Sequence, residues 1–190
     1  MPLRAARSNF FLVQALIVDW GGVLTTSLGS TFEEWARQDK IDYSHYRQIM
    51  AELLGPSAGA EAAYNPVHAL ERGEMEVADF ELHLASRLRS VDGGVVSPQG
   101  LLQRMFDRFE HAPDMNGLVR RAHALGYKTA LLSNSWGNSY PREGWTDMFD
   151  EVVISGEVGM RKPEARIYLH TCELLKVDPE VCVFVDDLPM

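Results

Sequence analysis

The sequence is poor in cysteine, with only Cys172 and Cys182 among its 190 residues. Two cysteines cannot form the dense disulfide framework of a small secreted domain, and this low usage is typical of proteins in a reducing compartment. No two of the six histidines stand at zinc-ligand spacing. We therefore expect a cytoplasmic protein without a disulfide framework or a zinc site.

Long hydrophobic runs are also missing. A membrane-spanning helix needs roughly 20 apolar residues. The best candidate, in the N-terminal stretch MPLRAARSNFFLVQALIVDW, is interrupted by Gln14 and ended by Asp19. No small-residue cleavage site follows, so a signal peptide is not indicated either. We interpret the stretch as an extended lead-in followed by a buried strand, and we expect no membrane partner.

Positive charge is scarce, because 18 lysines and arginines stand against 27 acidic residues, for a net charge of -9. No basic cluster offsets this balance, so a nucleic-acid partner is not expected. Repeats and low-complexity tracts are absent from the sequence as well. The length fits one domain, or one domain with a smaller insert, and the hydrophobic fraction of 46% is enough for a sizeable core.

Four short apolar runs and two helical patterns are present instead. The runs are too short for buried helices and are rich in β-branched or aliphatic residues, which is typical of strands covered on both faces. They span residues 15–18, 128–132, 151–154 and 181–185. Helical patterns over 114–127 and 163–177 separate the later runs. Strands that alternate with helices predict an α/β fold with a parallel sheet.

The segment between the first two runs has a different character. It contains no convincing strand, and it predicts helices over 31–40, 44–54, 77–90 and 98–110. Thr31 and Glu34 have the spacing of a capping box at the start of the first helix. We therefore predict a core domain of residues 1–29 and 111–190, and a small helical cap of residues 30–110 inserted after the first strand.

Chemically useful residues follow the ends of the predicted strands. In an open parallel sheet, ligands bind beyond the carboxyl ends of the strands. The residues expected there are Asp19, Gly21, Gly22, Ser133, Asn134, Lys162, Asp186 and Asp187. Carboxylates gathered at one edge indicate a hard divalent cation such as Mg²⁺. A lysine, a hydroxyl and free N–H groups at a glycine turn suit a phosphoryl group, and a carboxylate beside that group can be a covalent nucleophile.

Four stretches of the chain resemble the motifs of a known family, and they stand in the family's order. They are LIVDWGGVL, ALLSNSW, VGMRKPEARIY and VFVDDLP. The sequence resembles the haloacid dehalogenase superfamily of phosphotransferases. It is most similar to the branch that includes the N-terminal phosphatase domain of bifunctional soluble epoxide hydrolase. The resemblance implies a Rossmann-like core with an inserted helical cap.

The resemblance also implies a role for each site residue. Asp19 would be the catalytic nucleophile that becomes phosphorylated, and Lys162 would neutralise charge between it and the phosphate. Ser133 and Asn134 would hold the phosphoryl oxygens or neighbouring substrate atoms, beside the turn at Gly21 and Gly22. The Mg²⁺ ligands would be Asp19, the carbonyl of Gly21, Asp187 and, either directly or from behind the direct ligands, Asp186.

Gly21 departs from the family pattern. Phosphatases of the family place a second aspartate two residues after the nucleophile, where it protonates the leaving oxygen and then activates water. General acid and base catalysis of this kind contributes typically about 10²–10⁴-fold. The family also normally continues past the last motif with a helix and often another strand, whereas this sequence ends at Met190.

The leading hypothesis is a Mg²⁺-dependent phosphatase, monomeric or homodimeric, that acts on a small phosphorylated molecule. The alternatives are a catalytically weak or inactive phosphate-binding or regulatory domain and, third, a metal-independent haloacid dehalogenase.

Overall fold

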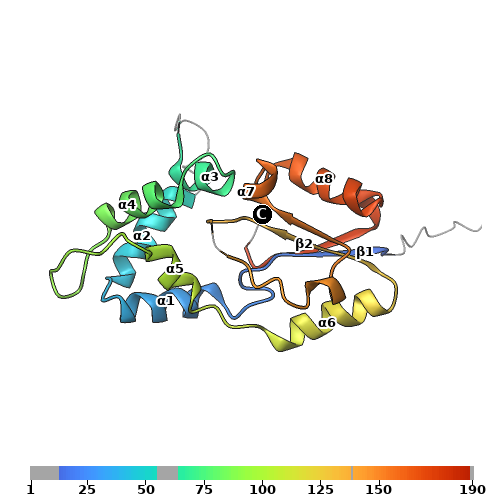
Figure 1. Ribbon diagram of the computed structural model, residues 1–190, viewed down its shortest axis with the longest axis horizontal. Helices are drawn as coiled ribbons and strands as arrows, with labels where there is room; N and C mark the ends of the chain where they lie inside the picture. Colours follow the sequence, from blue (N-terminus) through green and yellow to red (C-terminus); the bar gives the residue numbers. More distant parts are fainter. Residues whose placement is uncertain (1–12, 55–63, 138, 189–190) are drawn as a thin grey trace, which may run out of the picture.

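The computed structural model describes residues 13–54, 64–137 and 139–188. Its centre is a sheet of four parallel strands in the order β3-β2-β1-β4 (Figure 1). The strands are β1 (Ala15–Val18), β2 (Lys128–Ser133), β3 (Glu151–Ile154) and β4 (Cys182–Val185). Each lies within one residue of a run predicted from the sequence, so the predicted α/β fold is confirmed. The predicted N-terminal lead-in falls mostly on residues 1–12, outside the described part.

The register of the sheet brings the strand ends to one edge. Val18 lies opposite Val185, and the Asp19 N–H donates to the Val185 carbonyl at 2.9 Å. Ser133 ends β2 on the other side of β1. Because parallel strands run in the same direction, the residues that follow them leave from the same edge. Asp19 and Asp186 therefore emerge side by side.

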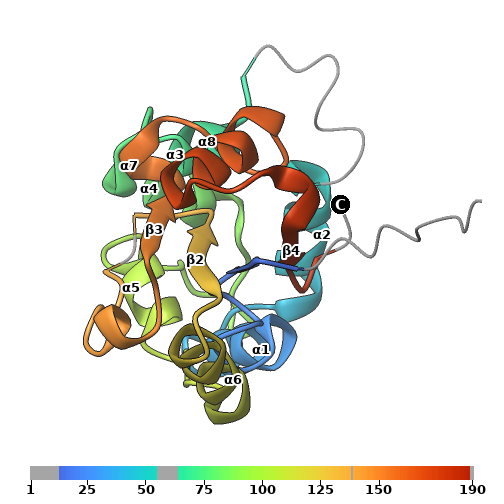
Figure 2. The same ribbon diagram turned by 90° about the vertical axis from the view of Figure 1, so that its right-hand side faces the viewer.

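Helices cover both faces of the sheet (Figures 1 and 2). They are α6 (Pro113–Ala124) on one face and α8 (Ala165–Leu175) on the other, with the short α7 (Ser155–Val158) directly after β3. Val18 packs in one apolar cluster with Val119 of α6, whereas its neighbour Ile17 packs in another with Ile167 of α8. This alternation, with both faces buried, explains why the strands read as continuous apolar runs.

Of the helices described between β1 and β2, the five that precede α6 form a unit of their own, which we call the helical insert (residues 28–106). They are α1 (Leu28–Gln38), α2 (Tyr43–Leu54), α3 (Pro66–Glu71), α4 (Val77–Arg87) and α5 (Leu101–Phe106). Trp35, Phe80, Leu84 and Met105 are fully buried in its core. Figure 1 shows the insert beyond the carboxyl ends of the strands. The predicted division into domains at 29/30 and 110/111 stays a prediction.

Two details of the insert differ from expectation. The first helix begins at Leu28 and is capped by Ser27, whose hydroxyl accepts from the Ser30 N–H at 3.4 Å. Thr31 instead donates its hydroxyl to the Ser27 carbonyl at 3.0 Å, so the predicted capping box does not form. Helix α3 is not among the helices that the sequence predicts. Asn65 caps α3, with Pro66 in the first turn, where a proline is well tolerated.

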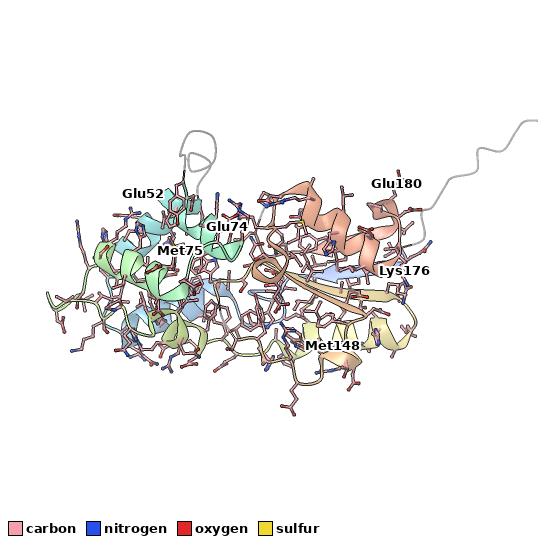
Figure 3. All side chains as sticks on the ribbon, turned by 45° about the horizontal axis from the view of Figure 1, so that its top comes forward. Glu52, Glu74, Met75, Met148, Lys176 and Glu180 are labelled. Atoms are coloured by element: carbon pink, nitrogen blue, oxygen red, sulfur yellow. The ribbon has the colours of Figure 1, made fainter. Side chains whose placement is uncertain are left out.

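The insert joins the sheet domain through two adjacent segments. Thr26 donates its N–H to the Glu110 carbonyl at 2.8 Å, and Ala112 donates to the Leu24 carbonyl at 2.9 Å. Asn116 of α6 also donates its side-chain amide to the Leu24 carbonyl at 2.8 Å. The segment that leaves the sheet domain and the segment that returns to it therefore lie side by side and are hydrogen-bonded to each other. Figure 3 shows the length of the molecule, with Glu52 and Glu74 on the insert and Lys176 and Glu180 at the far end.

Within the described residues, none of the helices combines the length and the apolar character needed to cross a membrane.

The insert also contacts the sheet domain at Gly73, which lies against the main chain of Gly156. Gly73 has a φ of +71°, and a Cβ there would lie 2.8 Å from the Gly156 carbonyl oxygen. Gly73→Ala should therefore lose roughly 2–5 kcal/mol of unfolding free energy, from backbone strain and overpacking together. Gly93 has a φ of +78°, but a Cβ there would meet nothing within 4 Å, so Gly93→Ala should lose only about 1–2 kcal/mol. Urea unfolding of both variants measures this. Equal losses would mean that the Gly156 contact relaxes without cost.

Candidate active site

A cavity of about 570 Å³ lies between the carboxyl ends of the strands and the helical insert. The sheet domain contributes most of the polar residues, and the insert contributes mainly apolar and aromatic side chains. The predicted site residues that line it are Asp19, Gly21, Ser133, Asn134, Lys162, Asp186 and Asp187. Gly22 is the one predicted site residue outside this lining. The residues singled out at the strand ends are thus brought together by the fold.

Lys162 connects the ends of two strands. Its ammonium nitrogen lies 2.9 Å from Asp19 Oδ1 and 2.6 Å from Asp186 Oδ2. The side chain is only 9% exposed, and its nitrogen lies 5.2 Å from the centroid of the Phe184 ring. A charge this deeply buried requires partners, and these two carboxylates supply them.

Asp187 completes a cluster of three carboxylates. Asp19, Asp186 and Asp187 each offer an oxygen atom within 4.8 Å of the others. Gly22 makes room for this arrangement, because a Cβ at Gly22 would lie 2.3 Å from Asp187 Oδ2. Its φ of +73° also favours glycine. The Gly22 N–H donates to the Thr25 hydroxyl at 2.9 Å, so the predicted phosphate contact of Gly22 stays a prediction.

Asn134 has a positioning role that no sequence pattern indicates. Its Oδ1 accepts from the Lys162 N–H at 2.8 Å, and its Nδ2 donates to the Lys162 carbonyl at 3.1 Å. One side chain thus binds both main-chain groups of the lysine. Ser133, which is almost fully buried, accepts from the Tyr140 hydroxyl at 3.0 Å. The predicted contacts of Ser133 and Asn134 with phosphoryl oxygens stay predictions.

The family follows from a comparison of the whole chain with known families. The sequence model of the haloacid dehalogenase-like hydrolases matches residues 13–189. The chain belongs to this family. The resemblance seen in the four motifs is therefore confirmed, and so is the prediction of a hydrolase of this superfamily.

Among relatives of this hydrolase, the bifunctional riboflavin kinase/FMN phosphatase of Arabidopsis thaliana is 33% identical over 92 residues, which are 46% of this chain and 24% of the relative. Bifunctional epoxide hydrolase 2 of Sus scrofa is 28% identical over 192 residues, 93% of this chain and 33% of the relative. The hydrolase therefore spans only about a quarter to a third of these proteins.

A solved structure supports the fold of the hydrolase. It is a haloacid dehalogenase family enzyme of Bacteroides thetaiotaomicron, crystallised with magnesium and inorganic phosphate. It superposes with a TM-score of 0.59 at 20% identity, covering 93% of this chain and 85% of that one.

Negative charge exceeds positive charge in the cluster formed by Lys162 and the three carboxylates of the hydrolase's site. Burial raises the pKa of Asp19 to about 6, with a further contribution from Asp186, although the nearby Lys162 ammonium opposes the shift. Burial, followed by the charge of Asp186, also raises the pKa of Asp187. One lysine does not compensate three carboxylates. An all-oxygen donor set with surplus negative charge fits a hard divalent cation such as Mg²⁺.

The surroundings of Gly21 are apolar. A Cβ at this position would lie 3.2 Å from Leu28 Cδ2 and 3.8 Å from Phe109 Cε1, and its φ lies outside the left-handed region. Trp20 stacks on Phe109 with 5.1 Å between ring centroids and lines the cavity. Trp20 therefore both packs against an aromatic neighbour and lines the pocket. A larger side chain at position 21 is compatible with the backbone and would meet apolar neighbours.

The raised pKa of Asp19 predicts a pH dependence of stability without divalent cations. Because the pKa rises from 3.8 to about 6 on folding, the folded state binds this proton more tightly than the unfolded state. The free energy of unfolding should therefore fall as pH rises from about 4 to about 6. Asp19→Asn removes this loss. The stability of the variant relative to wild type should grow by up to about 3 kcal/mol between pH 4 and pH 7. Urea unfolding in EDTA measures this, and a difference independent of pH would contradict it.

Proposed function

We propose that this hydrolase is a Mg²⁺-dependent phosphatase that acts on a small phosphorylated molecule through an aspartyl-phosphate on Asp19. The observation that carries the proposal is the contact of Lys162 with both Asp19 and Asp186 at the floor of the cavity. An ionised carboxylate beside a buried ammonium suits nucleophilic attack on an anionic phosphoryl group. The names of its relatives, which include an FMN phosphatase, also support it.

In the proposed mechanism, an Asp19 oxygen attacks phosphorus and the bond to the leaving oxygen breaks. Lys162 offsets negative charge on the phosphoryl oxygens, and Asn134 holds the lysine main chain in place. Asp19, Asp186 and Asp187 would hold the Mg²⁺ ion, with the Gly21 carbonyl as a further ligand. When bound, the ion would offset charge between the phosphoryl group and the carboxylates. Attack of water on phospho-Asp19 would then release inorganic phosphate and regenerate the carboxylate.

The side chains that line the cavity indicate the polarity of the substrate. The insert lines it with Leu28, Phe32, Met50, Met105 and Phe106, so most of the surface beyond the charged floor is apolar or aromatic. The volume of about 570 Å³ is within the range of small-molecule sites. We infer a phosphomonoester whose remaining part is largely apolar. A panel of phosphorylated compounds that differ in the apolarity of this part tests the inference by their kcat/KM values.

A catalytically weak or inactive phosphate-binding domain is the second candidate, and the residue at position 21 favours it. Gly21 provides no acid or base for the leaving oxygen. Among the described residues that line the cavity, Glu71 is the one carboxylate besides Asp19, Asp186 and Asp187. It is paired with Arg161. Cytoplasmic location and a monomeric or homodimeric state stay predictions.

The first prediction of the proposed function concerns the metal. Asp187→Asn removes one carboxylate charge from the cluster and should weaken Mg²⁺ binding at least roughly tenfold. Glu180→Gln is the matched control, because Glu180 is exposed at the far end of the molecule (Figure 3). Calorimetric titration of both variants at one pH and salt concentration measures the affinities. Equal Mg²⁺ affinity in the two variants would contradict the proposal that Asp187 is a Mg²⁺ ligand.

The second prediction concerns turnover. Gly21→Asp should raise kcat toward alkyl phosphates, by up to about 10²–10⁴-fold if the new carboxyl is well placed. Contact with Leu28 and Phe109 would raise the pKa of an aspartate at position 21, as suits a general acid. Aryl phosphates should gain less, because their leaving groups need less protonation.

Gly21→Asn is the control for this gain, since it has nearly the same shape and cannot transfer the proton. Equal rates for the Asp and Asn variants, both folded and binding Mg²⁺, would favour the second candidate function.

A further inference from the structure

Glu71, at the end of α3, binds three separate segments of the sheet domain. It is only 4% exposed. Its side chain accepts from Trp136 Nε1 at 3.1 Å and pairs with Arg161 Nε. Its main-chain carbonyl accepts from the Ser155 hydroxyl at 2.5 Å. The insert therefore reaches the loop after β2, the start of α7 and the loop before α8 through one residue.

Arg161 carries this connection to the catalytic lysine, because it directly precedes Lys162. Its side chain is 12% exposed, and its main-chain N–H lies 3.4 Å from Glu164 Oε2. Asn134 binds the main chain of the next residue. The direction in which Lys162 enters the site is thus set on one side by Asn134 and on the other by the ion pair of Arg161.

We propose that Glu71 of the helical insert is a positioning residue for Lys162 and acts through Arg161. The role of Lys162 in binding phosphate rests on the proposed function, but the positioning itself does not. A buried arginine that loses its partner carries an uncompensated charge. It should move toward water and displace the adjoining main chain of Lys162, so that the ammonium no longer holds its place between Asp19 and Asp186.

The competing explanation is that Glu71 only fastens the insert to the sheet domain. The two explanations differ in the sign of one effect. Loss of a negative charge from the lining of the cavity would, by Coulomb attraction alone, strengthen the binding of an anion. Loss of a positioning residue would weaken it, because the lysine is displaced.

The test compares Glu71→Gln with Arg72→Met in the whole protein. Arg72 is the next residue of the chain and forms another ion pair across the same interface, with Glu164 at 2.9 Å. Arg72 makes no direct contact described with Arg161 or Lys162. Its link to Arg161 runs through Glu164, whose Oε2 also lies 3.4 Å from the Arg161 N–H. Arg161→Lys is the second variant, used in parallel because it keeps the buried charge and changes its hydrogen-bond geometry. The amine that this substitution adds at position 161 is distinguished from Lys162 by fragment-ion mass spectrometry.

The first readout is the rate at which acetic anhydride modifies Lys162, measured by peptide mass spectrometry against the exposed Lys176 in the same molecule. We expect Glu71→Gln and Arg161→Lys to raise the relative rate roughly five- to tenfold, and Arg72→Met to leave it unchanged. This readout does not require any activity. The proposal would be overturned if Lys162 reacted no faster in Glu71→Gln and in Arg161→Lys than it does in wild type.

The second readout is the affinity for tungstate, a phosphate mimic, by calorimetry. We expect Glu71→Gln to weaken it roughly five- to tenfold. Tighter binding would overturn the proposal in favour of simple Coulomb attraction. Wild type that binds no tungstate, together with a faster-reacting Lys162 in the variants, would refute the proposed function and leave the positioning role standing.

Discussion

The site of this hydrolase depends on one buried ammonium. Lys162 lies between Asp19 and Asp186, which follow neighbouring strands and would otherwise repel each other. The lysine is itself buried and is stable there only because both carboxylates face it. It does not neutralise the third carboxylate, Asp187. The pKa of Asp19 stays raised at about 6 even beside the lysine. This remaining negative charge is the physical reason for proposing a divalent cation at the site.

The helical insert determines what this charged edge can meet. It closes the space beyond the strands with apolar side chains and leaves a cavity of small-molecule size. It also reaches back to the sheet domain at Glu71, which pairs with Arg161, the residue before Lys162. The same unit that shapes the substrate space is therefore connected to Lys162. A change in the insert has a route to the chemistry that needs no contact with the substrate.

With glycine at position 21, the groups proposed for binding are present but the side chain proposed for proton transfer is not. The groups proposed to bind phosphate and metal are assembled around Asp19, whereas the position proposed for an acid and base carries no side chain. Binding depends on charge and on fixed geometry, both of which remain. Turnover of a substrate with a poor leaving group depends also on proton transfer. The contacts around position 21 show that the fold keeps this place apolar rather than filling it with another polar group.

The sequence by itself determined the strands, the order of the motifs and the residues at the strand ends, because these depend on local apolar runs and on the rule that parallel strands share one active edge. Asp19, Lys162, Asp186 and Asp187 could be named on that basis. Only the tertiary structure decided that Asn134 holds the Lys162 main chain, that Gly22 makes room for Asp187, and that Glu71 pairs with Arg161. Glu71 and Arg161 lie 90 positions apart in the chain, and Gly22 and Asp187 lie farther apart still. No local pattern encodes such partners, since each depends on where the folded insert and loops come to lie.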